Sequence, residues 1–357
     1  MSANDSQLLI YGAYGYSGRL VVEAALRRGL QPVVAGRSAI KAAALGRETG
    51  LAHRAFALDD AAAARAALQG IAVVLNCAGP FSQTAAPMAE ACLAAGAHYL
   101  DITGEYPVIE ALAGRDRVFA EAGLLVMPSV GADVVPSDCL ALHVKQRLPQ
   151  AQRLELCIRL LDVPSRGTAN SFVEALGKPN VVRAGGQLVE RSMGADTRRV
   201  ELGDERVSMI GIPWGDIATA WRSTGIADIA VFMHMAQPGA QAFMALAGRS
   251  RAIWQSATMQ RLLKRLVQKL PEGPDAAARA AGRAEFLATA IDAAGHTVRS
   301  YLCTPEGYAL TAETASEIAR RVLSGELPPG SAGFRTPSMA FGADFILGFE
   351  GVTRRDL

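Results

Sequence analysis

Hydrophobic residues in the first 150 positions form short runs that alternate with longer amphipathic segments. The short runs predict β-strands at 8–11, 32–36, 53–58, 72–78, 98–102 and 124–128. The segments between them have a helical period and predict helices near 17–28, 39–49, 61–69, 84–95 and 107–122. Short apolar strands that alternate with helices are typical of βαβ units, so an α/β region with a parallel sheet of the Rossmann type is expected here.

The pattern changes near residue 150, where strand-like segments follow one another more closely. They predict strands at 153–162, 187–192, 198–203, 205–214 and 228–235, and a hairpin of 283–292 and 296–303 around an Ala-Ala-Gly turn. Helices are expected at about 168–177, at 240–270, and at 312–324 behind Thr311 as N-cap, whereas 327–337 has no regular pattern. This part is therefore predicted to be a second, α+β domain (149–307) on a mixed or antiparallel sheet.

Three glycines recur every third residue where the first strand gives way to the first helix. In such a turn the first glycine permits the sharp bend, the second lets the backbone approach a pyrophosphate, and the third lets the helix pack closely on the sheet. The start of the helix adds N–H donors and a partial positive charge. The candidate phosphate-binding residues are Gly12, Tyr14, Gly15, Tyr16, Ser17 and Gly18. A tight turn that binds nothing is the alternative.

The second strand ends in Arg37 and Ser38, where an NAD-binding domain would usually carry an acidic residue for the ribose. A guanidinium can instead bind the additional 2′-phosphate of NADP through charge-assisted hydrogen bonds. The predicted cofactor is therefore NADP. The alternative is a solvated surface arginine.

Two further strand ends supply candidate cofactor contacts. Asp59 follows the third strand and either faces the adenine or caps the next helix. The fourth strand ends in Ala78, Gly79, Pro80 and Phe81, at the edge of the sheet where dinucleotides bind. The alternative is that this segment is only a connecting loop.

Candidate proton donors lie in the segment that ends the fifth strand. Tyr99, Asp101 and Glu105 carry groups capable of proton transfer, and Tyr99 and Asp101 share one strand face. Asp101 and Glu105 have structural alternatives, as a turn cap and as an acidic residue at a helix start. No tyrosine has lysine four residues later, which argues against the proton delivery of short-chain reductases.

Composition narrows the class of protein. The chain has 357 residues and a net charge of +2, which gives no indication of nucleic acid as a partner. Its five cysteines form no CxxC pair and its histidines show no metal-ligand spacing, so reduced thiols, no metal site and a cytoplasmic location are expected.

The amphipathic helix expected at 252–270 has Met259, Leu262, Leu263, Leu266, Val267 and Leu270 on one face and basic residues elsewhere. It is interpreted as a core or dimer helix, with contact to a membrane or lipid-linked carrier as the alternative.

Several segments in order resemble the saccharopine dehydrogenase-like oxidoreductases, and among these the branch that includes trans-acting enoyl reductases. They are GAYGYSG, AGRS, NCAGPF, ACLAAGAHYLDITGE and PSVGADVVPSD, followed more weakly by RGTANSF and TPEGYALTAETA. The resemblance implies an NADP-binding Rossmann domain at 1–148, joined by the C-terminal helix and tail at about 308–357, and an α/β domain between them for substrate and dimer contacts. It also implies hydride transfer to an imine or a conjugated alkene.

The cationic residues that hold amino-acid carboxylates in true saccharopine-forming enzymes have no clear match here.

The sequence thus predicts an NADP-dependent oxidoreductase that delivers hydride to a C=C or C=N bond of a small or lipid-like substrate, with a homodimer as the expected assembly. A non-catalytic NADP-binding sensor or scaffold is the alternative.

Overall fold

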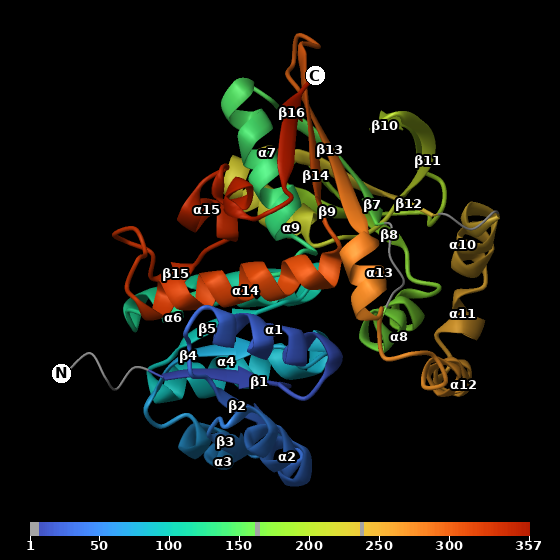
Figure 1. The fold of residues 1–357 in the computed structure, drawn as a ribbon. Coiled ribbons are helices and arrows are strands. Elements are labelled where there is room, and N and C mark those ends of the chain that lie inside the picture. Colours follow the sequence, from blue (N-terminus) through green and yellow to red (C-terminus); the bar gives the residue numbers. More distant parts are fainter. Residues whose placement is uncertain (1–6, 161–164, 236–238) are drawn as a thin grey trace. The chain divides into compact units, whose positions relative to one another are not determined.

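The computed structural model describes residues 7–160, 165–235 and 239–357, and its contacts divide the chain into two compact units. The first unit combines Met1–Val135 with Tyr308–Gly342, and the second combines Pro136–Gly307 with Ala343–Leu357. Figure 1 follows the chain through both units. Each unit contains one sheet.

The first unit is built on a sheet of seven strands in the order β15-β6-β5-β4-β1-β2-β3, and every neighbouring pair is parallel. The strands are β1 (Gln7–Tyr11), β2 (Val33–Gly36), β3 (His53–Ala55), β4 (Ile71–Asn76), β5 (His98–Asp101), β6 (Leu125–Met127) and β15 (Gly333–Phe334). Strands β1 to β6 have the 3-2-1-4-5-6 order of doubly wound dinucleotide-binding sheets. This order confirms the predicted Rossmann-type fold. Strands β1 and β4 meet where the direction of winding reverses.

Continuous apolar runs explain why these strands lie inside the unit. Leu9, Ile10, Val74, Leu75 and Leu100 are completely buried, as expected for parallel strands with helices on both faces. The helices are α1 (Tyr16–Arg27), α2 (Ala39–Thr49), α3 (Ala61–Ala67), α4 (Phe81–Ala95), α5 (Tyr106–Ala113), α6 (Asp116–Glu121), α14 (Gly307–Leu323) and α15 (Pro337–Phe341). The helix expected at 107–122 is divided into α5 and α6 by Gly114 and Arg115.

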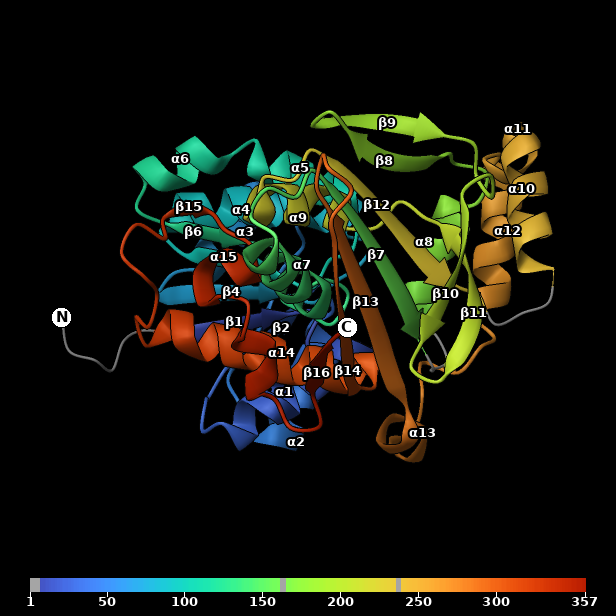
Figure 2. The same cartoon turned by 90° about the horizontal axis from the view of Figure 1, so that it is seen from above.

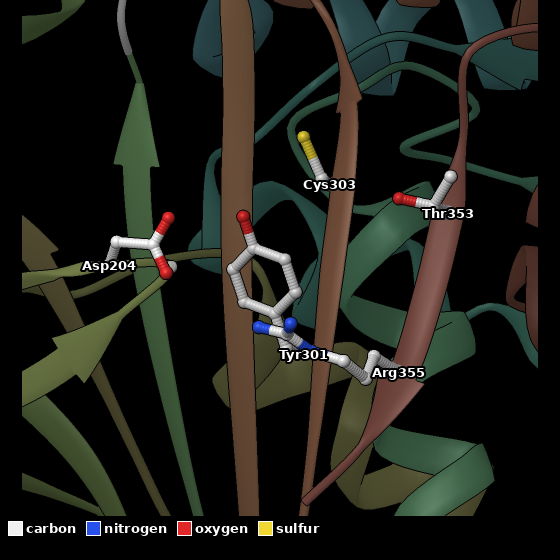
Figure 3. Close-up of a pocket in the computed structure, with 6 residues that line it drawn as sticks. Asp204, Tyr301, Cys303, Thr353 and Arg355 are labelled. Atoms are coloured by element: carbon white, nitrogen blue, oxygen red, sulfur yellow. The ribbon is translucent and has the colours of Figure 1, made fainter.

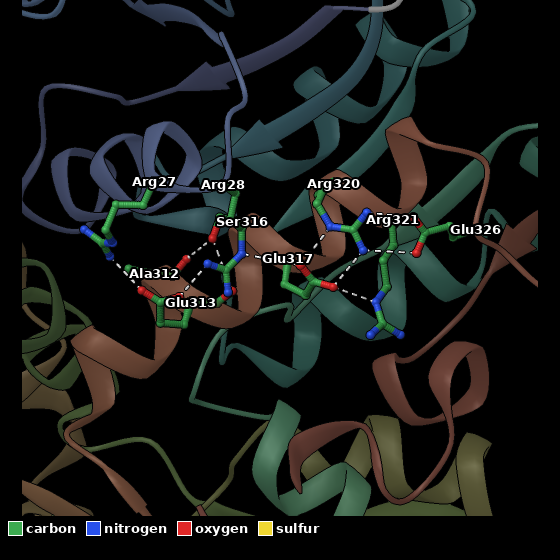
Figure 4. A network of polar contacts seen from close by, with 9 residues as sticks. All are labelled: Arg27, Arg28, Ala312, Glu313, Ser316, Glu317, Arg320, Arg321 and Glu326. Carbon is green, nitrogen blue, oxygen red and sulfur yellow. Dashed lines mark hydrogen bonds and ion pairs between the residues drawn. The ribbon is translucent and has the colours of Figure 1, made fainter. Parts of the chain in front are cut away.

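Helix α14 packs on α1 through a chain of ion pairs within the first unit. Glu313 pairs with Arg27 and Arg28, and Glu317 pairs with Arg320 and Arg321 of its own helix (Figure 4). The helix begins at Gly307, so the prediction of Thr311 as its N-cap was wrong. The Thr311 hydroxyl lies inside the helix, where it accepts a hydrogen bond of 2.9 Å from the backbone N–H of Ala132.

The second unit contains a mixed sheet of nine strands. Most of its strands are labelled in Figure 2. The strands are β7 (Arg153–Leu160), β8 (Asn180–Ala184), β9 (Gln187–Arg191), β10 (Thr197–Leu202), β11 (Glu205–Gly211), β12 (Asp228–His234), β13 (Arg283–Ile291), β14 (Thr297–Pro305) and β16 (Thr353–Asp356). Only the β7–β12 pair is parallel, whereas the hairpin β13–β14 and the other pairs are antiparallel. The predicted mixed or antiparallel sheet is therefore confirmed. The end of the predicted strand 153–162 lies outside the described residues.

The helices of the second unit are α7 (Val135–Arg147), α8 (Arg166–Ala175), α9 (Asp216–Thr224), α10 (Ala240–Arg249), α11 (Arg251–Trp254), α12 (Ala257–Val267) and α13 (Ala276–Ala281), with a 3-10 turn at Phe345–Gly348. The helical structure expected at 240–270 is confirmed, and turns at Ser250 and Gln255 divide it into three helices.

The contact division differs from the predicted boundaries at 148 and 308–357. Helix α7 groups with the second unit because its side chains bond there: Asp138 accepts from the Ser223 hydroxyl of α9, and His143 contacts Asp356 of β16. For the same reason residues 343–357, which contain β16, group with the second unit.

Candidate functional site

The glycine-rich turn joins β1 to α1 beside the end of β4. Gly12 has a φ of +77°, and a Cβ atom there would lie 2.9 Å from the Cβ and N of Ala78. A Cβ at Gly18 would lie only 2.2 Å from the carbonyl oxygen of Gly12. The first and third glycines are thus required by backbone conformation and by close packing, respectively.

The middle glycine of the turn has different surroundings. A Cβ at Gly15 would meet only the Gly12 oxygen, at 3.2 Å, and its φ of −75° suits any residue. Gly15 is the N-cap of α1 and has no side chain with which to cap it. The first-turn amides of a helix have no acceptor inside the helix, so this end can receive an anion.

Neighbouring helices of the same sheet begin differently, because each has a side chain at its start. Ser38 caps α2 and Asp60 caps α3 through hydrogen bonds to backbone N–H groups. The alternative of Asp59 as the α3 cap was therefore wrong, since Asp60 has that position. At α4 the Glu105 carboxylate accepts from the N–H groups of Phe81 and Ser82, at 3.0 and 3.1 Å.

The remaining candidates on the adenosine side follow β2 and β3, which are neighbouring parallel strands. The ring of Tyr14 lies over Gly36, and its hydroxyl accepts a 3.0 Å hydrogen bond from the N–H of Ser38. Arg37 and Asp59 are both exposed. Burial raises the pKa of Tyr11 to about 12, and the charges of Arg37 and Asp59 both act on this hydroxyl. Arg37 and Asp59 therefore lie within electrostatic reach of one group.

Tyr16 and Ser17, the other two candidates in this turn, begin helix α1. The Tyr16 ring packs edge-on against Tyr308 of α14, with ring centroids 5.2 Å apart. Its aromatic ring thus helps to hold α14 beside the turn.

The loop after β4 is held by internal hydrogen bonds. Asn76, which is fully buried, accepts from the N–H of Ala78 at 3.0 Å, and the Thr84 hydroxyl donates to the Ala78 carbonyl at 2.6 Å. The Gly79–Pro80 bond is cis, and Phe81 begins α4. Asn76 and Thr84 were not predicted as site residues, although the NCAGPF segment already contained Asn76.

The three predicted proton donors form a network that ties loops together. Tyr99 and Asp101 are completely buried, and the Tyr99 hydroxyl donates to Asp101 at 2.7 Å. Asp101 also accepts from the backbone N–H groups of Thr103 and Ser129, at 3.0 and 2.9 Å. Glu105, as described above, caps α4. These contacts connect the loops after β4, β5 and β6.

The electrostatics of this network follow from burial. Burial raises the pKa of Asp101 to about 6, although the three donated hydrogen bonds oppose the shift. Burial also raises the pKa of Tyr99 well above its usual value. Ser129 has a left-handed φ of 62°, which is unusual for a residue with a side chain and is held by the bond from its N–H to Asp101.

The second unit has an open polar hollow of about 390 Å³ (Figure 3). It is lined by Gly203, Asp204, Tyr301, Cys303, Thr353 and Arg355. The Arg355 guanidinium lies 5.3 Å from the centre of the Tyr301 ring, and the Tyr301 hydroxyl donates to Glu285. Among the described residues no cluster of His, Cys, Asp and Glu could hold a metal ion.

The order of the parallel sheet and the uncapped glycine turn define a Rossmann-type dinucleotide-binding unit. Residues 8–127 match the family described as saccharopine dehydrogenase NADP binding domain. The resemblance inferred from the sequence is thereby confirmed.

Two curated relatives show how far the similarity extends. The saccharopine dehydrogenase-like oxidoreductase of Homo sapiens is 30% identical over 162 residues, which cover 40% of this chain and 38% of the relative. The trans-acting enoyl reductase of Mycobacterium bovis (strain BCG / Pasteur 1173P2) is 29% identical over 166 residues, or 43% of this chain and 38% of the relative. The match thus spans less than half the length of these relatives.

A solved structure extends the likeness in fold to nearly the whole chain. Apo saccharopine dehydrogenase (L-Glu forming) from Saccharomyces cerevisiae superposes with a TM-score of 0.64 over 99% of this chain and all of that chain, at 11% sequence identity. At this identity the likeness concerns the fold alone.

None of the helices within the described ranges is both long and apolar enough to cross a lipid bilayer.

Proposed function

We propose that this protein is an NADP-dependent oxidoreductase that transfers a hydride from NADPH to a C=C or C=N bond. The observation that carries the proposal is the start of α1: an uncapped helix end at Gly15, beside the neighbouring strands β1 and β4, where the direction of winding of the sheet reverses. Such a point is where doubly wound sheets bind dinucleotides.

The residues present fit NADP. Within 4 Å, a Cβ at Gly15 would meet only the Gly12 oxygen, so the first-turn amides of α1 can approach a pyrophosphate. Arg37 is exposed at the end of β2, and among the described residues it makes no ion pair, so its guanidinium is available to a 2′-phosphate. Gly79 offers backbone groups to the ribose on the nicotinamide side, and the bonds of Ala78 to Asn76 and Thr84 hold this loop in place.

Bound NADPH would supply the hydride, and the chain would supply placement. The hydrogen bonds of Tyr99, Asp101 and Glu105 support a positioning role for these residues rather than direct proton donation, because they fix the loops that follow β4, β5 and β6. The name of the M. bovis relative supports an enoyl, C=C substrate. The C=N alternative follows from the resemblance to saccharopine dehydrogenases.

Binding and turnover test the proposal separately. NADPH is titrated against the protein, and NADPH absorbance is then followed with enoyl thioesters, with keto acids plus lysine or glutamate, and with quinones. Binding with oxidation of NADPH by one class identifies the reaction. Tight binding with no turnover across the panel would favour the alternative of a sensor, and absence of binding would contradict both.

A further inference from the structure

The segment 240–270 of the second unit combines exposed hydrophobic side chains with an unusual charge. It contains cations and no Asp or Glu, although the whole chain is nearly neutral: the cations are Arg249, Arg251, Arg261, Lys264, Arg265 and Lys269. The segment folds as α10, α11 and α12, which lie together beside α8 in Figures 1 and 2. We call its exposed side the α10–α12 face.

Exposed apolar side chains are concentrated on this face. Six of the thirteen large hydrophobic residues that the described part of the chain exposes are Phe243, Leu246, Ile253, Leu262, Leu266 and Leu270. Leu246, Leu262 and Leu266 are 60%, 51% and 50% exposed. Of the expected core or dimer helix at 252–270, the core part was therefore wrong for Leu262, Leu266 and Leu270, whereas the dimer part stays a prediction.

The helix wheel of α12 explains this outcome. The side that packs on the unit contains buried Val267, while Gln260 donates to the Val173 carbonyl at 2.8 Å and Lys264 pairs with Glu174 of α8 at 2.6 Å. Away from that side, Leu262 and Leu266 are exposed beside the exposed Arg261 and Arg265. Thr258, Arg261, Leu262 and Arg265 surround a hollow of about 300 Å³ there.

We propose that the α10–α12 face docks on the surface of a membrane that contains anionic lipids. Leucine side chains interleaved with long cations match the acyl boundary and the phosphate layer, because Arg and Lys can extend their charges outward while their stems remain apolar. The absence of carboxylates from 240–270 fits a partner that is uniformly negative.

A second copy of the chain fits this face poorly. A twofold dimer places the same patch against itself, so cations without compensating carboxylates would face one another. An acidic protein would match the charge. However, the apolar side chains are spread over three short helices, and this arrangement favours a broad lipid surface.

Vesicle sedimentation tests the proposal on the full chain. Vesicles of phosphatidylcholine alone are compared with vesicles that contain phosphatidylglycerol, at low and high salt. We expect binding only to the anionic vesicles, weakened by salt, and reduced more than about tenfold in Arg261→Glu/Arg265→Glu. Leu262→Ser/Leu266→Ser should lose binding that persists at high salt.

Matched variants keep the result interpretable. Arg191→Glu/Arg199→Glu changes net charge by the same amount on exposed strands β9 and β10, and Leu188→Ser removes an exposed leucine of β9. Both should bind vesicles like the unchanged protein, and thermal unfolding should show that all variants fold. Equal binding by the α12 variants and these controls would overturn the proposal.

If a second copy of the chain or an acidic protein binds the α10–α12 face instead, the experiments give different results. Absence of vesicle binding together with a dimer that Leu262→Ser/Leu266→Ser dissociates, measured by sedimentation velocity, would assign the face to a second copy. Absence of vesicle binding with capture of polyglutamate that depends on Leu262 and Leu266 would assign it to an acidic protein. Either result overturns the membrane proposal.

Discussion

The hydroxyl of Tyr99 donates a 2.7 Å hydrogen bond to the carboxylate of Asp101, and both side chains are completely buried. Asp101 thereby accepts hydrogen bonds from three donors, since the N–H groups of Thr103 and Ser129 donate to its other oxygen. The carboxylate joins two loops at the edge of the sheet where a dinucleotide is proposed to bind.

This arrangement predicts a specific pH dependence of stability. Because burial raises the pKa of Asp101 to about 6, the folded chain holds this proton more tightly than the unfolded chain between about pH 4 and about pH 6. Stability is therefore expected to fall across that window as pH rises, by roughly 3 kcal/mol from this group.

Substitutions of Asp101 separate the effect of its titration on stability from the effect of its hydrogen bonds. Asp101→Asn keeps an oxygen for Thr103 and Ser129 but does not titrate, so urea unfolding at several pH values should show the fall in the unchanged protein and not in the variant. Asp101→Ala leaves both amides without this acceptor and should lose about 1–3 kcal/mol for each. Parallel pH profiles for the unchanged protein and Asp101→Asn would contradict the assignment.

Arg37 is predicted to set the preference for NADPH over NADH. A charge-assisted hydrogen bond contributes about 1.5–3 kcal/mol, so Arg37→Ala should weaken NADPH by roughly ten- to a hundredfold and leave NADH nearly unchanged. Fluorescence or calorimetric titration measures both constants. Arg65→Ala removes another exposed cation, from helix α3, and serves as the control. If the unchanged protein binds both cofactors equally, Arg37 has no such role.

The two glycines at the start of α1 should respond differently to one methyl group. In Gly15→Ala the new atom meets only the Gly12 oxygen at 3.2 Å, so stability should change by less than about 1 kcal/mol while NADPH affinity falls more than tenfold. In Gly18→Ala the 2.2 Å approach to the same oxygen requires the backbone to move, which should cost about 1–3 kcal/mol or more. Thermal unfolding and titration distinguish the two. Undiminished NADPH binding by Gly15→Ala would place the cofactor elsewhere.

Local patterns were sufficient to predict the frame of both units. The apolar runs of β1, β4 and β5 predicted the parallel sheet, because a hydrophobic period depends on neighbouring residues. The phosphate-binding role of the glycine turn stays a prediction. The short edge strand β15 was not predicted, since Gly333 and Phe334 give too little pattern.

Roles that depend on distant partners could not be predicted in the same way. Glu105 caps a helix that begins 24 residues earlier, and Asp101 binds the N–H of Ser129, 28 residues later. The residue types suggested acid–base chemistry, whereas the partners show that the carboxylates hold loops. Similarly, the period of α12 identified two faces, but not that Leu262 and Leu266 would be exposed.

Glu317 provides the last prediction, which concerns acid stability of the first unit. Its carboxylate lies 3.0 Å from Arg320 and 2.8 Å from Arg321, and the Arg320 hydrogen bond is the main reason that its pKa falls to about 2 (Figure 4). A lowered pKa stabilises the fold at neutral pH, and this contribution is lost as pH falls from about 4.5 toward 2. Glu317→Gln should therefore lose roughly 2–3 kcal/mol of unfolding free energy at neutral pH and little in strong acid.

Glu121→Gln serves as the control, because it breaks an exposed pair with Arg117 and should change the unfolding free energy by less than about 0.5 kcal/mol. Urea unfolding of the three proteins at neutral and acidic pH measures these differences, and an equal loss in both variants would show that the Glu317 pairs contribute no more than a surface ion pair.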